Sequence, residues 1–264
     1  MQYKAGFIGC GNMGGALARA AANAACGIIA VCDNDSAKTA LICKECGTVS
    51  VDTQKIIQSS EFVFLGLKPQ IMYDAVSPWV DIINSSNTII VTMAAGLSIS
   101  FFKDTLKISR PIIRIMPNTP CSIGSGMILY ACSASVNSEA EASFLEVMKN
   151  AGRLDKLPEN LIDAASTVSG CGPAFAYIFA EALADAGVEC GLPRDKAILY
   201  ASQMLKGSAE MILQNGSPAT LKDNVCSPGG TTIAGVHALE SSGFRAAAMN
   251  AVTSAYKRTL ELKK

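Results

Sequence analysis

Two stretches of the chain combine residue types and spacing that could do chemistry, and the first is rich in glycine. Gly9-Cys10-Gly11-Asn12-Met13-Gly14 fits the pattern G-x-G-x-x-G, after a strand-like run and at the start of a helical one. In that pattern the glycines allow a tight turn, close approach of the backbone to a pyrophosphate and close helix–strand packing. The unpaired N–H groups of the helix would face the phosphates. A plain glycine-rich turn is the alternative, but the flanking strand and helix favour dinucleotide binding.

The second stretch is a loop rich in Ser, Gly and Thr. It reads Lys222-Asp223-Asn224-Val225-Cys226-Ser227-Pro228-Gly229-Gly230-Thr231-Thr232 and runs directly into a helix that we expect to begin near Thr231. Its backbone N–H groups and two hydroxyls could hold a small carboxylate at the helix N-terminus without a positively charged side chain. An ordinary capped helix is the alternative, because Thr is a fair N-cap residue.

The residues at the end of the second strand-like run should determine whether the protein binds NAD or NADP. Asp33 lies 19 residues beyond Gly14, where an acidic residue accepts the ribose hydroxyls in NAD enzymes. Asn34, Ser36 and Lys38 follow and could instead contact a 2′-phosphate, although this turn contains no arginine. The local pattern leans towards NADH.

Three further segments follow strand-like runs, at the edge where an open α/β sheet holds its ligand. Small residues and prolines at such positions let a ligand approach the backbone, although each segment could be an ordinary turn. They are Leu67-Lys68-Pro69, Met93-Ala94-Ala95-Gly96 and Arg114-Ile115-Met116-Pro117-Asn118-Thr119-Pro120.

The elements that must position these residues alternate between strand-like and helical runs in the first half of the chain. Strand-like runs cover residues 4–9, 27–32, 48–51, 61–67, 87–92 and 111–115, with helical stretches at 12–26 and 36–46. Several runs are almost continuously apolar, which suits parallel strands covered on both faces. The alternation predicts a doubly wound α/β domain.

After about Pro158 the pattern changes to alanine-rich helical segments broken by Gly and Pro, with no further strand-like run. Pro173, Pro193 and Pro218 could each begin a helix, since proline is accepted in a helix's first turn. We therefore expect an α/β domain over residues 1–157 and an all-α domain over 158–264, with a short joint near 155–160.

Composition excludes several classes of protein. Of the 264 residues, half are hydrophobic and 17% are charged, with 22 basic and 22 acidic side chains. So apolar a chain is not disordered, and its zero net charge gives no electrostatic footprint for nucleic acid or an anionic membrane surface. The low charge suggests a buried oligomer interface; a helical protein with many small surface residues is the alternative.

Ten cysteines are spread evenly along the chain and do not form the clustered framework of a small secreted domain. No signal peptide is recognised, and no apolar run reaches the roughly 18 residues that span a bilayer. A reducing cytoplasm is the expected compartment. Cys43 and Cys46 form the one CxxC pair; with a single histidine in the chain we expect no metal site, and a structural rather than a redox role for the pair.

Together these motifs make the whole chain resemble the Δ1-pyrroline-5-carboxylate reductase family. The N-terminal motif is shared by many dehydrogenases, whereas residues 221–240 are the most specific part. The resemblance rests on Gly6-Phe7-Ile8-Gly9-Cys10-Gly11-Asn12-Met13-Gly14, Lys68-Pro69, Ala94-Ala95-Gly96, Met116-Pro117-Asn118-Thr119-Pro120, Ser169-Gly170-Cys171-Gly172-Pro173-Ala174-Phe175, Gly191-Leu192-Pro193-Arg194 and the Lys222–Thr232 loop.

The resemblance implies hydride transfer from NADPH or NADH to the C=N carbon of 1-pyrroline-5-carboxylate, which gives L-proline in the last step of proline biosynthesis. It implies a Rossmann-type doubly wound sheet with an all-α C-terminal dimerisation domain, and dimers that often assemble into a ring. Family members commonly prefer NADPH, and Asp33 departs from the Ser or basic residue often found there.

Site residues carried over from the family fall into two groups. For the substrate, the Thr232 hydroxyl would be the catalytic group that bonds the ring nitrogen, the backbone of Gly230, Thr231 and Thr232 would bind the carboxylate, and Glu159 would lie nearby. For the cofactor, the residues are Ile8, Gly9, Cys10, Gly11, Asn12, Met13, Gly14, Asp33, Leu67, Lys68, Pro69, Ala94, Ala95, Asn118 and Asn224. The imine can arrive protonated, so catalysis needs mainly orientation and a hydrogen bond.

Three alternatives are weighed against this assignment. His237, the only histidine, could act as an acid or base, but the family does not require it, and we expect an ordinary helix residue. A β-hydroxyacid dehydrogenase would carry a catalytic lysine in the region 169–177, which has none. A protein that senses NAD(P)H without turnover would leave the Ser227–Thr232 loop without a purpose.

Overall fold

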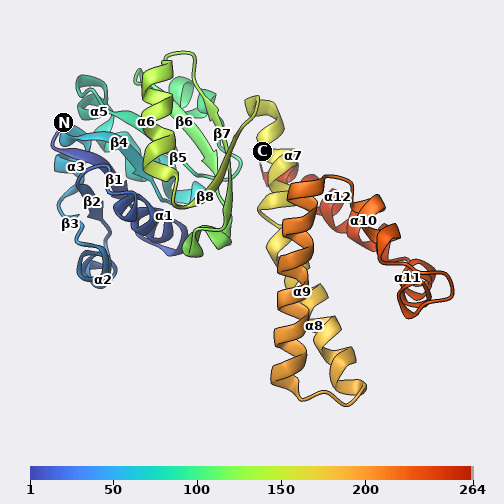
Figure 1. Cartoon of the computed structure of the whole chain (residues 1–264). Helices are drawn as coiled ribbons and strands as arrows, with labels where there is room; N and C mark the ends of the chain where they lie inside the picture. The colour runs from blue at the N-terminus through green and yellow to red at the C-terminus, as the bar shows by residue number, and fades with distance from the viewer. Residues whose placement is uncertain (263–264) are drawn as a thin grey trace. The chain divides into compact units, whose positions relative to one another are not determined.

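The strands within residues 1–262, which the computed structural model describes, form one eight-stranded sheet (Figure 1). Its order is β3-β2-β1-β4-β5-β6-β7-β8. The first six strands thus follow the order 3-2-1-4-5-6 of doubly wound dinucleotide-binding sheets. The strands are β1 (Tyr3–Ile8), β2 (Ile29–Cys32), β3 (Val49–Ser50), β4 (Ser60–Leu65), β5 (Ile89–Thr92), β6 (Ile112–Met116), β7 (Gly126–Cys132) and β8 (Gly152–Lys156).

Helices cover both faces of this sheet and create two apolar cores. One core lies under α1 (Asn12–Asn23), α2 (Ser36–Cys46) and α6 (Ser138–Met148). The other lies under α3 (Thr53–Ser59), α4 (Met72–Val76), α5 (Val80–Ser85) and α7 (Glu159–Ser169). Shorter turns of helix are η1 (Pro69–Ile71), η2 (Ser77–Trp79), η3 (Phe101–Thr105) and η4 (Thr119–Ile123).

Two aromatic side chains pack together at the centre of the sheet. Phe7 of β1 stacks on Phe64 of β4 with ring centroids 4.3 Å apart, and both side chains are completely buried. The two strands are parallel neighbours, with Phe7 opposite Phe64. Because the chain goes from β1 to β2 on one side and returns to β4 on the other, the carboxyl ends of β1 and β4 form the topological switch point, where ligands bind in such sheets.

The sequence pattern does not predict β7 and β8, and with them the sheet becomes mixed. β7 pairs antiparallel with β6 and parallel with β8. β8, at the sheet edge, has the half-exposed sequence Gly-Arg-Leu-Asp-Lys, which carries no strong strand signal. β7 is almost continuously apolar and could have been recognised.

Most expected helix starts are confirmed. The helix over Ser36–Cys46 has the expected bounds: Asp35 caps its start by accepting from the Ala37 N–H, and Gly47 ends it with a φ of 66°. α10 begins at Pro218 and α11 at Thr231. The expected helix over 12–26 is shorter, because α1 ends at Asn23.

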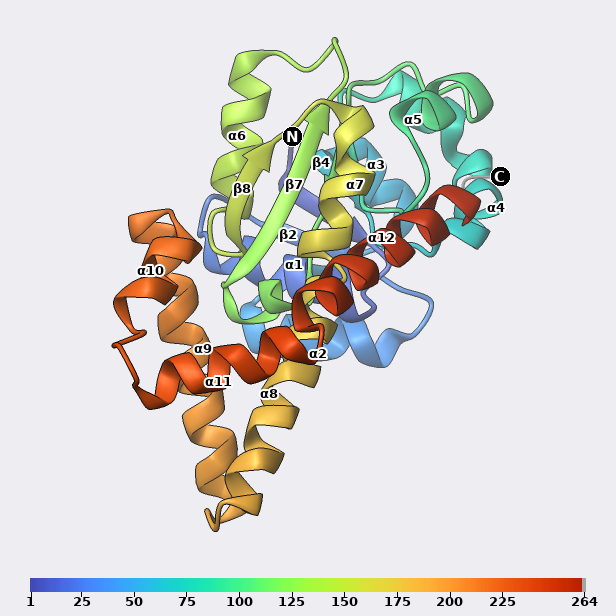
Figure 2. The same cartoon turned by 90° about the vertical axis from the view of Figure 1, so that its right-hand side faces the viewer.

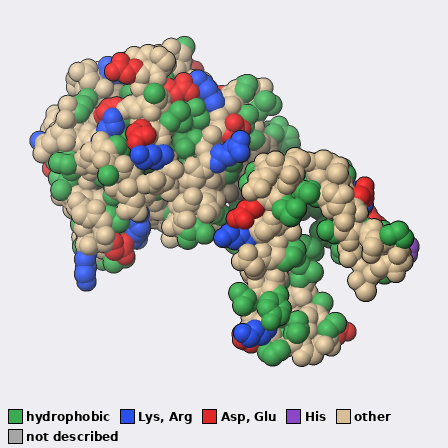
Figure 3. Space-filling model, in the orientation of Figure 1, with side chains coloured by type: hydrophobic (Ala, Val, Ile, Leu, Met, Phe, Trp, Pro, Cys, Tyr) green, Lys and Arg blue, Asp and Glu red, His purple; other side chains and the backbone are tan. Residues whose placement is uncertain are grey.

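A second compact unit, Gly172–Ala255, is entirely helical among its described residues. It contains α8 (Gly172–Glu189), α9 (Arg194–Asn215), α10 (Pro218–Asn224), α11 (Thr231–Ser241) and the first part of α12 (Phe244–Leu262). Within residues 172–255 the buried side chains are only Ala184, Ala197 and Ala201. Figure 3 shows hydrophobic side chains over the surface of the α8–α9 pair.

The first unit comprises Met1–Cys171 and the residues from Tyr256 onward, so α7 belongs to it. Figure 2 shows α7 beside β7, against which it packs. The domain boundary that we expect at 157/158 stays a prediction. Among the described residues, no helix is both long enough and apolar enough to cross a membrane.

Candidate functional site

The glycine-rich loop follows β1 at the switch point, and each of its glycines has a different structural role. Gly9 has a φ of +94°, a conformation that favours glycine. A Cβ on Gly14 would lie 2.0 Å from the Gly9 carbonyl oxygen, so α1 can pack against the loop only without a side chain there. A Cβ on Gly11 would meet nothing within 4 Å. The backbone at Gly11 is therefore open to a ligand, as a pyrophosphate requires.

The start of α1 offers unpaired donors at this point. Gly11 is the N-cap residue and supplies no side-chain acceptor for the first-turn N–H groups. Such a helix N-terminus attracts anions through its free N–H groups and its dipole. The loop thus has the shape and the polarity that fit the diphosphate of a dinucleotide.

A cleft of about 820 Å³ runs along the carboxyl ends of the strands beside this loop. Its lining combines residues of several expected segments with four that the sequence analysis missed as site residues, Cys32, Thr53, Gly66 and Ile71. The expected cofactor residues that line it are Ile8, Gly9, Gly11, Asn12, Met13, Gly14, Asp33, Leu67 and Lys68. Gly66 falls inside the expected run 61–67, but it directly follows β4, which ends at Leu65; its residue type was the available signal.

Asp33 braces the glycine-rich loop from the end of β2. The Cys10 backbone N–H donates to its Oδ2 at 2.6 Å, and the Asp35 N–H donates to its Oδ1 at 2.9 Å. The Lys38 Nζ lies 3.9 Å from Oδ1. Both carboxylate oxygens therefore accept from backbone N–H groups, and Asp33 lines the cleft together with Asn34 and Lys38.

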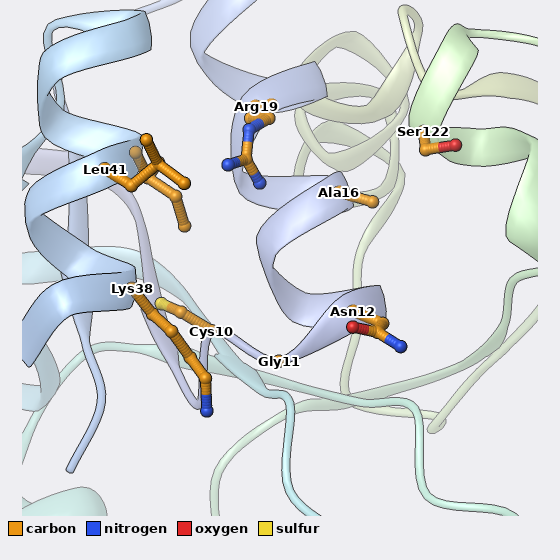
Figure 4. A pocket seen from close by; sticks show the side chains of 9 residues that line it. Cys10, Gly11, Asn12, Ala16, Arg19, Lys38, Leu41 and Ser122 are labelled. Atoms are coloured by element: carbon orange, nitrogen blue, oxygen red, sulfur yellow. The ribbon is translucent and has the colours of Figure 1, made fainter. Parts of the chain in front are cut away.

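A second cavity, of about 470 Å³, adjoins the other side of the loop (Figure 4). Asn12, Ala16 and Arg19 reach it from α1, and Lys38 and Leu41 reach it from α2. Arg19 is paired with Glu45, with 2.6 Å between Nε and Oε2. Lys38 lines both this cavity and the cofactor cleft. Its ammonium group lies 3.9 Å from the Asp33 Oδ1 and 3.6 Å from the Asp35 Oδ2.

Cys10 sits in the loop but is poorly suited to covalent chemistry. Burial, and next the negative charge of Asp33, raise the pKa of its thiol to about 12. The Sγ also contacts the Cys32 carbonyl oxygen at 3.6 Å. The thiol therefore stays protonated near neutral pH, and Cys10 contributes to the site through its backbone N–H and its shape.

Five expected cofactor residues of the first unit do not line the cleft, namely Cys10, Pro69, Ala94, Ala95 and Asn118. Ala94 is buried. The Asn118 amide already has two protein partners, because its Nδ2 donates to the Ser169 carbonyl at 2.9 Å and its Oδ1 accepts from the Met127 N–H at 2.9 Å. The contacts of these residues with a cofactor stay predictions.

Glu159 is engaged with the protein rather than directed to the cofactor cleft. Its Oε1 accepts from the Ile99 N–H at 2.7 Å and lies 3.3 Å from a guanidinium nitrogen of Arg114. It also lines a separate cavity of about 610 Å³. A role for Glu159 near the substrate stays a prediction, and Arg114 is a residue whose importance the sequence analysis missed.

The Ser-, Gly- and Thr-rich loop lies in the second unit, between α10 and α11. α11 begins at Thr231, and its N-cap is Gly230, which has no side chain to accept from the first turn. The alternative of an ordinary Thr-capped helix is therefore wrong. Thr231 and Thr232 are exposed at this open N-terminus, where backbone N–H groups could bind a carboxylate.

The remaining candidate residues lie on helices of the second unit and on α2. Asn224 is the last residue of α10, and His237 is an exposed residue of α11. Cys43 and Cys46 lie on α2 as free thiols. Among residues 1–262 no group of three or more His, Cys, Asp or Glu side chains could hold a metal ion.

Two family models match the chain. The model described as pyrroline-5-carboxylate reductase dimerisation matches residues 159–262, and the model described as NADP oxidoreductase, coenzyme F420-dependent, matches residues 4–96. Together they cover the segments that contain the two motifs.

Individual relatives cover the whole chain. It is 38% identical to the pyrroline-5-carboxylate reductase of Escherichia coli K12 over 100% of both chains. It is also 38% identical to that of Glycine max, over 98% of this chain and 96% of the relative.

Two solved structures have the same fold over the same extent. One is a pyrroline carboxylate reductase from Plasmodium falciparum with NADP bound, with a TM-score of 0.87 and 31% identity, covering 99% of this chain and 100% of the other. The other is a pyrroline-5-carboxylate reductase from Coxiella burnetii, with a TM-score of 0.91 and 28% identity, covering 100% of each.

Proposed function

Because this chain belongs to the pyrroline-5-carboxylate reductase family, and so reduces the C=N bond of 1-pyrroline-5-carboxylate to L-proline with NAD(P)H, we propose how its residues divide that work. The first unit holds the cofactor in the cleft at the switch point. The second unit binds the substrate at the start of α11. The observation that carries this proposal is the open N-terminus of α11 after Gly230.

The cofactor supplies the hydride, and the glycine-rich loop binds the cofactor. Gly11 leaves room for the diphosphate, and the first-turn N–H groups of α1 neutralise its charge. Asp33 supports the loop, since its carboxylate accepts from the Cys10 N–H and the residue lines the cleft.

The substrate is a small anion, and no basic patch is needed to bind it. The N–H groups at Thr231 and Thr232 bind its carboxylate at the helix N-terminus. The Thr232 hydroxyl bonds the ring nitrogen and orients the imine carbon for attack. Because a cyclic imine can be protonated before it binds, positioning supplies most of what the reaction needs from these side chains.

The testing experiment is steady-state oxidation of NADPH and of NADH by purified protein with 1-pyrroline-5-carboxylate. Turnover that forms L-proline is expected. Cofactor binding without turnover would favour a sensor of NAD(P)H, and turnover only with a β-hydroxyacid would favour the rival dehydrogenase. Either result would sink the assignment.

We propose that the chain forms a homodimer through its second unit and that dimers assemble further into a ring. The dimerisation segment at residues 159–262 supports the dimer. The exposed apolar side chains of α8 and α9 support it too, among them Tyr177, Ile178, Ile198 and Tyr200. Sedimentation velocity tests both levels of assembly.

We also propose that the enzyme works in the cytoplasm. The ten cysteines are all free thiols, as a reducing compartment maintains them. Cell fractionation that finds the protein in an oxidising compartment would contradict this.

A further inference from the structure

The cavity of about 610 Å³ lies entirely within the first unit and shares no lining residue with the cofactor cleft. Its lining comes from η3 and the residue Ile99 before it, from the ends of β7 and β8 and the residues after them, and from the first residue of α7. The steps of the reduction proposed above do not involve this cavity, although its lining contains three charged side chains.

Lys103 gives the cavity an ammonium group without a protein partner. Among residues 1–262 the two half-buried lysines are Lys4 and Lys103. The Lys4 Nζ lies 2.8 Å from the Glu61 Oε2, whereas the Lys103 ammonium has no hydrogen bond or ion pair to a described residue. Partial burial of a charge costs free energy unless an opposite charge compensates it. Lys103 therefore favours an anionic group in the cavity.

Glu159 gives the same cavity a carboxylate oxygen that is free to accept. Its Oε1 accepts from the Ile99 N–H at 2.7 Å and lies 3.3 Å from the Nη1 of Arg114. Its Oε2 has no partner among the described residues, and the side chain is 30% exposed. Because the contacts of Oε1 hold the carboxylate in place, Oε2 can accept from the ammonium group of a ligand.

Lys156 adds a second ammonium group to the lining. Its Nζ lies 2.6 Å from the Glu141 Oε2, which occupies one of its three donors. Burial raises the pKa of the Cys132 thiol to about 11, so this neighbouring group in the lining stays neutral near pH 7. The charged groups of the lining are therefore two ammonium groups, of Lys103 and Lys156, and the carboxylate of Glu159.

A ligand that complements this lining carries two negative groups and one positive group. Ile99, Leu157 and Pro158 also line the cavity and offer apolar contact to a short carbon chain. At neutral pH an α-amino acid with a second carboxylate has this set of charges, because both of its carboxyl groups are ionised and its amino group is protonated.

We propose that this cavity binds an acidic α-amino acid, at a site separate from the cofactor cleft. The α-ammonium group of the ligand donates to the Glu159 Oε2, and its α-carboxylate accepts from the ammonium group of Lys103. The second carboxylate accepts from Lys156. Each of these contacts is a charge-assisted hydrogen bond, the stronger class of hydrogen bond in proteins.

The test titrates L-glutamate into the full-length protein in a calorimeter. L-Glutamate should bind more tightly than L-glutamine, which lacks the second charge, and than glutarate, which lacks the ammonium group. Lys103→Met should raise the Kd for L-glutamate roughly tenfold, as loss of a charge-assisted hydrogen bond does, and keep the wild-type Kd for NADPH. Lys55→Met is the matched control: it removes an exposed lysine of α3 and should change neither Kd.

Lys156→Met tests the second carboxylate. In this variant L-glutamate and L-glutamine should bind with the same Kd, because the group that distinguishes them has lost its partner. A Kd difference as large as in the wild type would contradict the assignment of Lys156.

Two results would overturn the site as a whole. One is failure of the wild type to bind L-glutamate, which would fit a direct pairing of Lys103 with Glu159 instead. The other is binding that Lys103→Met leaves unchanged, which would place the ligand elsewhere on the protein. Because binding is measured without turnover, failure of the reductase assay would contradict the proposed function and leave this result as it stands.

Discussion

Thr232 is the residue on which the proposed chemistry depends most directly. Its hydroxyl is exposed at the start of α11. Thr232→Ala should lower kcat roughly 100-fold, the usual effect of removing one hydrogen bond that strengthens in a transition state. NADPH binding, measured by fluorescence titration, should not change.

His237→Ala is the matched control on the same helix. We expect wild-type kcat/KM, because His237 is an exposed helix residue and not part of the site. If Thr232→Ala kept its activity and His237→Ala lost it, the two roles would have to be exchanged. Thr232→Ser should restore most of the turnover by restoring the hydroxyl.

Asp33 and Lys38 should affect the preference between NADPH and NADH in opposite directions. Asp33 and Lys38 both line the cleft, with the Lys38 Nζ 3.9 Å from the Asp33 Oδ1. We predict that the 2′-phosphate of NADPH adds its negative charge beside them. Asp33→Ser should raise the NADPH-to-NADH ratio of kcat/KM roughly tenfold, the effect of about 1.4 kcal/mol. Lys38→Ala should move the ratio the other way. An unchanged ratio in both variants would contradict a role of Asp33 and Lys38 in cofactor preference.

Asp33→Ser should have a second effect that the sequence alone does not predict. Because the carboxylate accepts from the Cys10 N–H at 2.6 Å, its removal loosens the glycine-rich loop. The Kd for both cofactors should therefore rise.

Among the elements, the junction of β1, α1 and β4 depends on close backbone packing. A Cβ on Gly14 would lie 2.0 Å from the Gly9 oxygen, and one on Gly66 would lie 2.3 Å from the same oxygen. Gly14→Ala should destabilise the protein by about 1–3 kcal/mol, as overpacking does, measured by denaturant unfolding. Gly11→Ala is the control: it meets nothing within 4 Å, so it should fold normally and lose only cofactor affinity.

Elements with a local signal were predictable from the sequence. The runs that contain β1, β2, β4, β5 and β6 are apolar enough to be recognised, and the glycine-rich turn and the start of α11 follow from residue types. β8 was missed because its five residues are half exposed and owe their conformation to pairing with β7.

Contacts between distant residues were not predictable. Arg114 meets Glu159 and Asp163 across 45 and 49 residues of sequence. A single arginine in an apolar strand indicates a buried partner, but nothing local shows which carboxylate provides it. Asn118 similarly reaches Ser169, 51 residues on.

At the scale of the whole molecule, the low fraction of charged residues goes with an apolar surface on the second unit. Large apolar side chains are exposed on α8 and α9, whereas the first unit buries its apolar side chains in two cores. The double variant Ile178→Asp/Ile198→Asp should shift the protein towards a monomer in sedimentation, because it places charges on the α8–α9 surface.

The control for this shift is Gln203→Asp, which adds a charge at an exposed polar position of α9. It should sediment like the wild type. A wild-type protein that sediments as a monomer would contradict the homodimer, and an unaltered size in the double variant would place the interface elsewhere.

A helical unit whose buried side chains are three alanines has a consequence for how the protein is made. Residues 172–255 bury too little apolar surface alone to offset the entropy lost on folding. Their folding must then be linked to association, as in obligate homodimers without a stable monomer. Recovery of activity after dilution from denaturant should accelerate with protein concentration, so expression level itself sets how fast newly made chains become active.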